Sequence, residues 1–200
     1  MEYGQQIRAR MLQPALVTLT ASRISPDHLT ALSLMFGLAF APCWYLQSFT
    51  TAIVCLWLHV ILDGLDGPLA RHQQCESPRG SFTDSFCDQI VVSVVTIMLM
   101  ISPPRISVVA GSLYLVVYTG VLAIAMVRNS LQIPYSWLVR PRLFVYVAIP
   151  LQLAGIPHLI NSVIWISNAL LAWKLATGFY RLRRRLDGPQ AESNSSGTQK

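Results

Sequence analysis

Long apolar runs alternate with short polar breaks along most of the chain. The breaks are rich in Pro, Gly, Ser, Gln and Arg, which is typical of turns between helices. Apolar runs of about 18 residues or more are long enough to cross a bilayer as helices. We expect spans at residues 29–46, 82–101, 108–127, 143–153 and 159–180. One more span begins with residues 51–62 and continues into a polar stretch. The pattern therefore predicts an all-α polytopic membrane protein with six transmembrane helices.

The two ends of the chain differ from these spans. Residues 1–25 place apolar positions among Arg8, Arg10 and Arg23, which favours an amphipathic helix at the membrane interface. Residues 186–200 are rich in Ser, Gly, Asn and Gln, so we expect a disordered tail there. The predicted organisation is a juxtamembrane helix at 1–25, a six-span domain at 26–185 and a tail at 186–200.

The composition supports a membrane protein. Of 200 residues, 53% are hydrophobic and only 12% are charged, which is too apolar for an ordinary soluble domain. The net charge of +6 could indicate nucleic-acid binding, but the cations gather at the ends of apolar runs. That distribution is typical of a topology signal, so we expect membrane lipid and no nucleic acid as a partner.

The arginines predict the orientation of the spans, because short cytoplasmic loops carry an excess of Lys and Arg. All but Arg105 fall on one side of the predicted layout, namely Arg8, Arg10, Arg23, Arg71, Arg79, Arg128, Arg140, Arg142, Arg181, Arg183, Arg184 and Arg185. Both termini are therefore expected to face the cytoplasm, in the cytoplasmic membrane.

Four of the nine acidic residues lie beside the second and third apolar runs, namely Asp63, Asp66, Asp84 and Asp88. Their i, i+3 and i, i+4 spacings place two on one face of each helix, and we expect these helices to pack antiparallel. Four carboxylates so close together need cations, because membrane charge is costly and like charges repel. An all-oxygen site suits Mg²⁺ or Mn²⁺, and two ions fit the number of ligands.

Arg71 and three small residues accompany the aspartates. Gly67, Ala70 and Gly80 are expected to let the helices approach and a ligand enter. Arg71 offers a planar donor group suited to phosphate. Carboxylate-held metals beside an arginine indicate phosphoryl-type transfer from a diphosphate, with one carboxylate as general base. Alternatively the acids pair with arginines to hold helices together, although Arg71 can serve only one of them.

The same residues resemble the motif of the CDP-alcohol phosphatidyltransferases, D-x2-D-G-x2-A-R-x8-G-x3-D-x3-D. Every fixed position is matched, by Asp63, Asp66, Gly67, Ala70, Arg71, Gly80, Asp84 and Asp88. A long motif with every spacing kept is a specific signal. The resemblance extends to the six-span layout and implies a homodimer.

The resemblance implies a role for each aspartate. Asp63, Asp66 and Asp84 would bind one metal ion, and Asp63, Asp84 and Asp88 a second. Asp88 would also take the proton of the acceptor hydroxyl. The acceptor oxygen would attack the β-phosphorus of CDP-diacylglycerol, so that CMP leaves and a phospholipid forms.

The resemblance also implies a binding site for the CDP-lipid, made by Asp27, Thr30, Gly67, Ala70, Arg71, Ser77 and Gly80. Asp27 and Thr30 belong to the stretch 26–30, which is similar to a second family signature, P-[ND]-x-[LIV]-T. Pro-Asp is also an ordinary start of a helix, so a structural role remains open for these residues.

The acceptor is left open by the sequence. Arg128, Arg140 and Arg142 lie in a predicted cytoplasmic loop and could cradle a phosphorylated polyol such as inositol 1-phosphate or glycerol 3-phosphate. They could equally be topology signals, and serine or another small alcohol could be the acceptor. A family member that joins a soluble CDP-alcohol to diacylglycerol, a cation-coupled transporter and an inactive scaffold are the alternatives.

Overall fold

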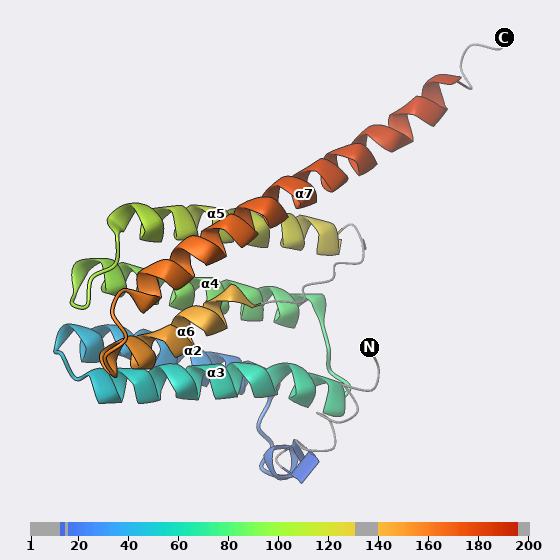
Figure 1. Ribbon diagram of the computed structural model, residues 1–200. Coiled ribbons are helices and arrows are strands. Elements are labelled where there is room, and N and C mark those ends of the chain that lie inside the picture. The colour runs from blue at the N-terminus through green and yellow to red at the C-terminus, as the bar shows by residue number, and fades with distance from the viewer. Residues whose placement is uncertain (1–12, 15, 131–139, 196–200) are drawn as a thin grey trace. The chain divides into compact units, whose positions relative to one another are not determined.

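The computed structural model describes residues 13–14, 16–130 and 140–195, which form helices joined by short connections (Figure 1). The chain divides into two compact units, Met1–Pro104 and Arg105–Lys200. The first unit contains α2 (Pro26–Tyr45), α3 (Phe49–His72) and α4 (Pro78–Ile101), and the second contains α5 (Val108–Ser130), α6 (Pro141–Leu153) and α7 (Leu159–Ser195).

The all-α membrane class predicted from the sequence agrees with these helices. Five of the described helices, α2, α3, α4, α5 and α7, are long and apolar enough to cross a membrane. Helix α6 is apolar but has 13 residues, or about 20 Å at 1.5 Å per residue. That is shorter than a hydrocarbon core of about 30 Å. The described residues thus provide five spans by length and one shorter apolar helix.

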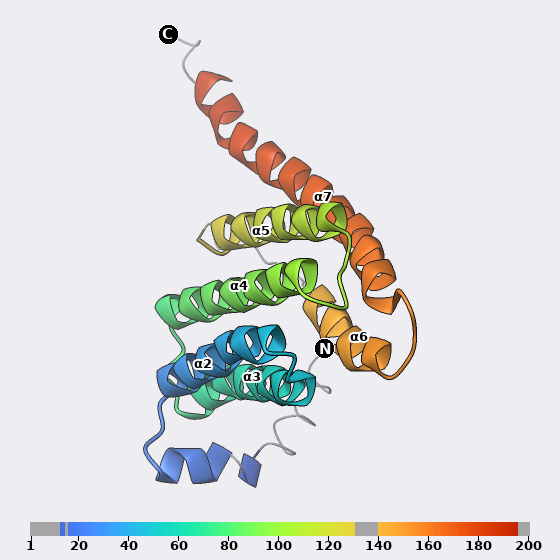
Figure 2. The ribbon, with the colours of Figure 1, turned by 90° about the vertical axis from the view of Figure 1, so that its left-hand side faces the viewer.

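In the first unit, α2 packs against both α3 and α4 (Figure 2). The three helices run antiparallel in succession. The sequence led us to expect close packing between α3 and α4 themselves, and this expectation is wrong along their length. Gly37 explains the difference, because a Cβ on it would collide with the Val91 side chain of α4. The missing side chain lets α2 lie directly on α4.

We expect Gly37→Ala to lower the free energy of unfolding by about 1–3 kcal/mol, because the added methyl overpacks the contact with Val91. Thermal unfolding in detergent measures the change. Gly64→Ala is the matched control, since a Cβ there meets nothing within 4 Å and alanine is the better helix former. Equal destabilisation by both substitutions would contradict the packing role of Gly37.

Both helices that begin near the aspartates have side-chain caps. In α2 the Ser25 hydroxyl accepts from the His28 N–H at 3.3 Å, and Pro26 takes the first helical position. In α4 the Ser77 hydroxyl accepts from the Gly80 N–H at 3.0 Å. Each bond satisfies a backbone donor that has no partner within its helix.

Helical residues 13–14 and 16–21 precede α2. Leu16 forms an apolar cluster with Leu29 of α2 and Leu69 of α3. The Gln73 side-chain amide at the end of α3 donates to the Ile24 carbonyl at 2.9 Å. These contacts attach the segment to the ends of α2 and α3. The rest of the predicted interfacial helix, residues 1–12 and 15, lies outside the described residues.

In the second unit, α7 packs against both α5 and α6. The Asn168 side-chain amide of α7 donates to the Ala110 carbonyl of α5 at 3.0 Å. Gly120 of α5 lies against Leu175, and Gly178 of α7 lies against Ile124. Small residues and interhelical hydrogen bonds of this kind hold helices together in lipid.

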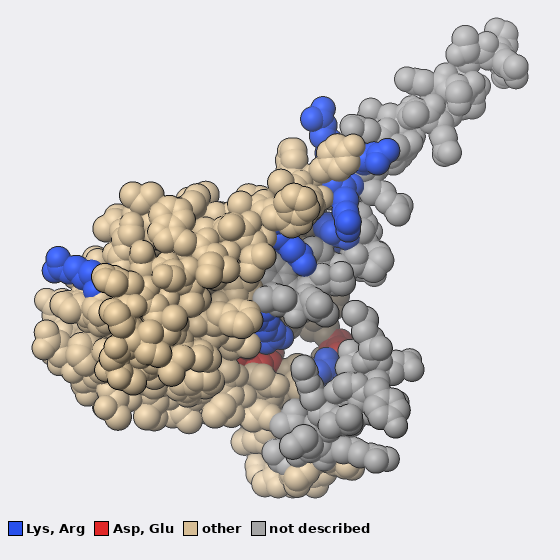
Figure 3. All heavy atoms as spheres, viewed as in Figure 1, with Lys and Arg blue, Asp and Glu red and all other residues tan. Residues whose placement is uncertain are grey.

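Helix α7 extends further than the sequence predicted. Its backbone is helical to Ser195, where a disordered tail was expected from Leu186; residues 196–200 lie outside the described part. Extending an existing helix requires no new nucleation, which favours such a continuation. Arg181, Arg183 and Arg184 are exposed near the end of its apolar part, and Figure 3 shows Lys and Arg side chains gathering along this helix.

Candidate metal centre

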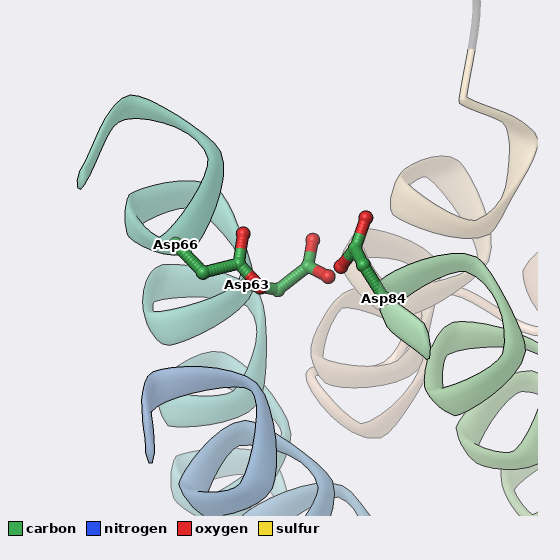
Figure 4. A group of neighbouring side chains, drawn as sticks. All are labelled: Asp63, Asp66 and Asp84. Atoms are coloured by element: carbon green, nitrogen blue, oxygen red, sulfur yellow. The ribbon is translucent and has the colours of Figure 1, made fainter. Parts of the chain in front are cut away.

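Three carboxylates from two helices converge in the first unit. Asp63 and Asp66 of α3 and Asp84 of α4 each offer an oxygen, and these atoms lie within 4.8 Å of one another. Figure 4 shows the α3 and α4 side chains pointing toward one another. Asp66 is 6% exposed, whereas Asp63 and Asp84 are half-buried. The structure thus brings together three of the four aspartates singled out in the sequence.

Asp66 is fixed by hydrogen bonds from two directions. The Thr30 hydroxyl of α2 donates to its Oδ2 at 2.8 Å, and the Gly67 N–H donates to its Oδ1 at 2.6 Å. A carboxylate oxygen has two lone pairs, so each oxygen keeps one for another ligand. These contacts orient the buried carboxylate without using up its capacity to bind a cation. The sequence singled out Thr30 through the 26–30 signature but did not indicate its bond to Asp66.

The arrangement fits a hard divalent cation. The donor set consists of carboxylate oxygens, which suit Mg²⁺ or Mn²⁺ better than Zn²⁺, whose sites favour nitrogen and sulfur. In an octahedral Mg²⁺ site with ligands at about 2.1 Å, opposite oxygens are about 4.2 Å apart. The three oxygens all lie within 4.8 Å of one another, which is close to this spacing, and χ2 rotations, which are soft in aspartate, would adjust it.

Asp88 lies one helical turn beyond Asp84 on α4, about 6 Å along the axis. It is half-buried and is not a member of the group formed by the other three aspartates. Its position on the same face is suitable for a second ion or for a base beside the first. Both roles remain predictions.

The three small residues of the motif differ in their surroundings, and Gly67 borders open space. A Cβ on Gly67 would meet only the Arg71 guanidinium, at 3.9 Å. A Cβ on Gly80 would lie 3.3 Å from the Ser77 hydroxyl, within the same helix start. Ala70 is half-buried. Gly67 therefore leaves room next to Asp66, as a bound ligand would require.

The remaining predicted CDP-lipid residues, Asp27, Arg71 and Ser77, lie at ends of α2, α3 and α4. Arg71 is exposed, and its Nη1 lies 3.6 Å from Glu76 Oε1, with both side chains 62% exposed. An exposed ion pair is worth about 0–1 kcal/mol, so it leaves the guanidinium able to turn to another anion. Asp27 is exposed in the first turn of α2, where Ser25 is the cap. Ser77 is exposed and caps α4.

A second contact between α2 and α3 lies one helical turn before Asp63 along α3. His59 is buried, and its Nδ1 lies 2.8 Å from the Ser33 hydroxyl oxygen. The Ser33 hydroxyl donates to the His59 carbonyl at 3.0 Å. Together with the bond between Thr30 and Asp66, this contact fixes the register of the two helices that build most of the centre.

The three arginines considered for the acceptor lie in the second unit. Arg128 is in the last turn of α5 and Arg142 in the first turn of α6, and both are buried. Arg140 precedes α6 and is exposed. Burial of Arg128 and Arg142 is unusual for charges that serve only to orient loops in water.

An apolar helical protein with acidic residues converging from two helices is typical of a membrane enzyme that uses a divalent metal. Residues 23–180 match the family of CDP-alcohol phosphatidyltransferases. The chain belongs to this family, which confirms the resemblance found in the sequence.

Individual relatives match shorter stretches. The chain is 32% identical over 116 residues to archaetidylinositol phosphate synthase of Aeropyrum pernix, covering 57% of this chain and 53% of the relative. It is 31% identical over 97 residues to inner membrane protein YnjF of Escherichia coli strain K12, covering 48% of this chain and 47% of the relative. The chain thus matches about half the length of these relatives.

Solved structures share the fold. The phosphatidylinositol phosphate synthase of Mycobacterium tuberculosis with CDP-DAG bound superimposes with a TM-score of 0.70 and 19% identity. The match covers 86% of this chain and 92% of that one. The same synthase in complex with manganese and citrate gives the same TM-score and identity, over 84% and 86% of the two chains. At this identity the likeness establishes the fold.

Proposed function

We propose that this protein transfers the phosphatidyl group of CDP-diacylglycerol to a small alcohol, releases CMP and so contributes to phospholipid synthesis. The observation that carries the proposal is the convergence of Asp63, Asp66 and Asp84 within the complete family motif. A synthase with the same fold has been solved with CDP-DAG bound and with manganese, which supports this choice of donor and cofactor.

Asp63, Asp66 and Asp84 would hold the first Mg²⁺ or Mn²⁺ ion, and Asp88 with Asp63 and Asp84 the second. When bound, the metal neutralises the negative charge of the diphosphate and of the departing CMP. Thr30 would contribute to the metal site indirectly, because its hydroxyl fixes the orientation of Asp66.

The remaining residues of the centre bind the donor and move the proton. Asp88 would accept the proton of the acceptor hydroxyl while the oxygen of that hydroxyl attacks the β-phosphorus. Arg71 would leave its exposed ion pair with Glu76 to bind the diphosphate. The rest of the CDP group would be bound by the small residues beside the aspartates and by the starts of α2 and α4. The residues are Asp27, Thr30, Gly67, Ala70, Ser77 and Gly80.

The proposed setting is a cytoplasmic membrane, with the active site and both termini on the cytoplasmic side. The arginine distribution supports this orientation. In this setting α6 is a sixth, shorter span, and the segment before α2 lies at the interface. We further propose a homodimer, on the basis of the family resemblance.

Assays of the purified protein with CDP-diacylglycerol labelled in its lipid part test the function. Inositol 1-phosphate, glycerol 3-phosphate, serine and free inositol serve as acceptors in separate reactions. We expect one acceptor to give a labelled phospholipid together with an equal amount of CMP. Failure of every acceptor, together with lipid formation from a soluble CDP-alcohol and diacylglycerol, would replace the proposed donor with the alternative one.

Arg140 tests whether the acceptor carries a phosphate. Because Arg140 is exposed, Arg140→Gln should leave the fold intact. If its guanidinium binds the phosphate, KM for the acceptor rises about 10- to 150-fold, which corresponds to about 1.5–3 kcal/mol for a hydrogen bond to a charged group. KM for CDP-diacylglycerol stays the same, and Arg183→Gln is the matched control. Equal changes in both KM values, or none, would contradict the acceptor role.

A further inference from the structure

A group of exposed arginines follows the apolar part of α7. Arg181, Arg183 and Arg184 are exposed, and these three form what we call the α7 arginine cluster. Figure 3 shows basic side chains gathering on this part of the helix. Four arginines and a single acid, Asp187, fall within residues 181–187, so positive charge predominates there. In the sequence these arginines served only to predict the orientation of the spans.

The length of α7 places the arginine cluster just beyond a membrane core. Residues Leu159–Arg184 form a candidate membrane span. From Leu159 to Tyr180 is 22 residues, or about 33 Å at 1.5 Å per residue, close to a hydrocarbon core of about 30 Å. If Leu159 lies at one boundary of the core, Tyr180 lies at the other, where tyrosine is enriched. The arginine cluster occupies the next helical turn, at the level of the lipid headgroups.

The guanidinium of Arg184 lies back against this boundary. Its Cζ is 5.7 Å from the centroid of the Tyr180 ring, over the face of the ring. Side chains of a helix lean toward its N-terminus, which here is the direction of the apolar part. The donors of a guanidinium lie in its plane, so stacking on a ring leaves them able to bind a phosphate in bidentate fashion. Arg184 is therefore suited to a phosphate at the membrane boundary.

Exposed aromatic side chains lie on the membrane side of the same arginines. Phe179 and Tyr180 are each 60% exposed, and Trp173, two turns before Tyr180, is 74% exposed. Phe179 precedes Arg183 by four residues, and Tyr180 precedes Arg184 by four, so each ring shares a helix face with one arginine. Apolar surface followed by a phosphate-binding group is the order of chemistry in a phospholipid, whereas a soluble phosphate ester has no use for the aromatic part.

We propose that this end of α7 binds an anionic phospholipid, with the lipid phosphate on the α7 arginine cluster and the acyl chains along the exposed aromatic side chains. A zwitterionic lipid fits less well, because its headgroup carries a cation that the arginines repel. Anionic lipids are a feature of the cytoplasmic leaflet, which agrees with the orientation under "Proposed function". Binding does not depend on the proposed reaction, and no residue of the candidate metal centre takes part in it.

Native mass spectrometry of the full chain, freed of lipid in detergent, measures this binding. Phosphatidylglycerol and phosphatidylcholine with identical acyl chains are titrated separately. We expect tighter binding of phosphatidylglycerol. The triple variant Arg181→Gln, Arg183→Gln and Arg184→Gln should lose about 10- to 100-fold in affinity for phosphatidylglycerol, since each basic residue near an anionic lipid surface contributes severalfold. Its affinity for phosphatidylcholine should stay the same.

Two further variants keep the test decisive. Arg184→Gln alone should lose about fivefold in affinity for phosphatidylglycerol, which covers the case of a triple variant that does not fold. Arg105→Gln is the matched control, because Arg105 is also exposed but precedes α5, and we expect no change. Thermal unfolding without lipid shows which variants are folded.

Three results would overturn the proposal. The first is equal affinity of the unmodified chain for the two lipids. The second is a folded variant of the cluster that binds phosphatidylglycerol as tightly as the unmodified chain does. The third is displacement of the lipid by free glycerol phosphate, which would assign the arginines to a soluble anion. Because the readout is bound lipid, failure of the proposed enzymatic function leaves this test unaffected.

Discussion

Asp66→Asn is expected to lower the rate of CMP release by about 10³-fold. Loss of a carboxylate charge from the metal centre removes several kcal/mol of stabilisation of the departing phosphate, and three orders of magnitude correspond to about 4 kcal/mol. Asparagine has nearly the same shape, and its single amide oxygen still accepts the hydrogen bond from Thr30 while the bond from the Gly67 N–H is lost, so the fold should remain. The rate is measured at saturating CDP-diacylglycerol and acceptor over a range of Mg²⁺ and Mn²⁺ concentrations.

Glu76→Gln is the matched control, because it makes the same chemical change at an exposed acid. We expect its rate to stay within about twofold of the unmodified protein, as exposed ion pairs contribute little. Thermal unfolding of both variants separates loss of activity from loss of structure. A folded Asp66→Asn protein with nearly full activity would contradict the metal role of Asp66.

Asp88→Asn is expected to lower kcat by about 10²–10⁴-fold, the usual range for removal of a general base. The two roles proposed for Asp88 predict different metal dependences. If Asp88 acts as the base alone, the metal concentration that gives half the maximal rate stays unchanged. If it also binds the second ion, that concentration rises. Steady-state rates across a metal titration distinguish the two.

Cys87→Ser, at the preceding residue of α4, is the control for Asp88→Asn. Its side chain is also half-buried, and we expect its kcat to remain within about twofold, since a serine is close to a cysteine in size. An Asp88→Asn protein that keeps more than a tenth of the original kcat would exclude Asp88 as the base.

The convergence of Asp63, Asp66 and Asp84 was predictable because its sequence pattern is local. Asp63 and Asp66 are three residues apart, and helix periodicity alone places them on one face of α3. Asp84 meets them because α4 follows after a short loop, so the two helix ends stay close. The full family motif added the role proposed for each aspartate. The bond from Thr30 to Asp66 could not be predicted, because it depends on how α2 rotates against α3.

The arrangement of the helices was less predictable. Apolar runs gave the approximate extents of all six helices, because burial in lipid requires length and apolarity. They could not show that α2 lies against both α3 and α4. That packing depends on Gly37 meeting Val91, a contact between residues far apart in sequence.

The C-terminal end of α7 was also not predicted from the sequence. Composition favoured disorder from Leu186, because polar residues bury little surface. Composition does not reflect the helix that precedes the segment, and a helix already formed extends more readily than a new one begins. The predicted boundary therefore came too early in the chain.

Metal dependence of CMP release is the sharpest test of the proposed metal centre. The purified protein is stripped of metal with a chelator and supplied with CDP-diacylglycerol and the acceptor found in the panel. We expect no CMP release until Mg²⁺ or Mn²⁺ is added in excess of the chelator, and recovery of the rate once it is added. An equal rate of CMP release with and without the chelator would contradict it.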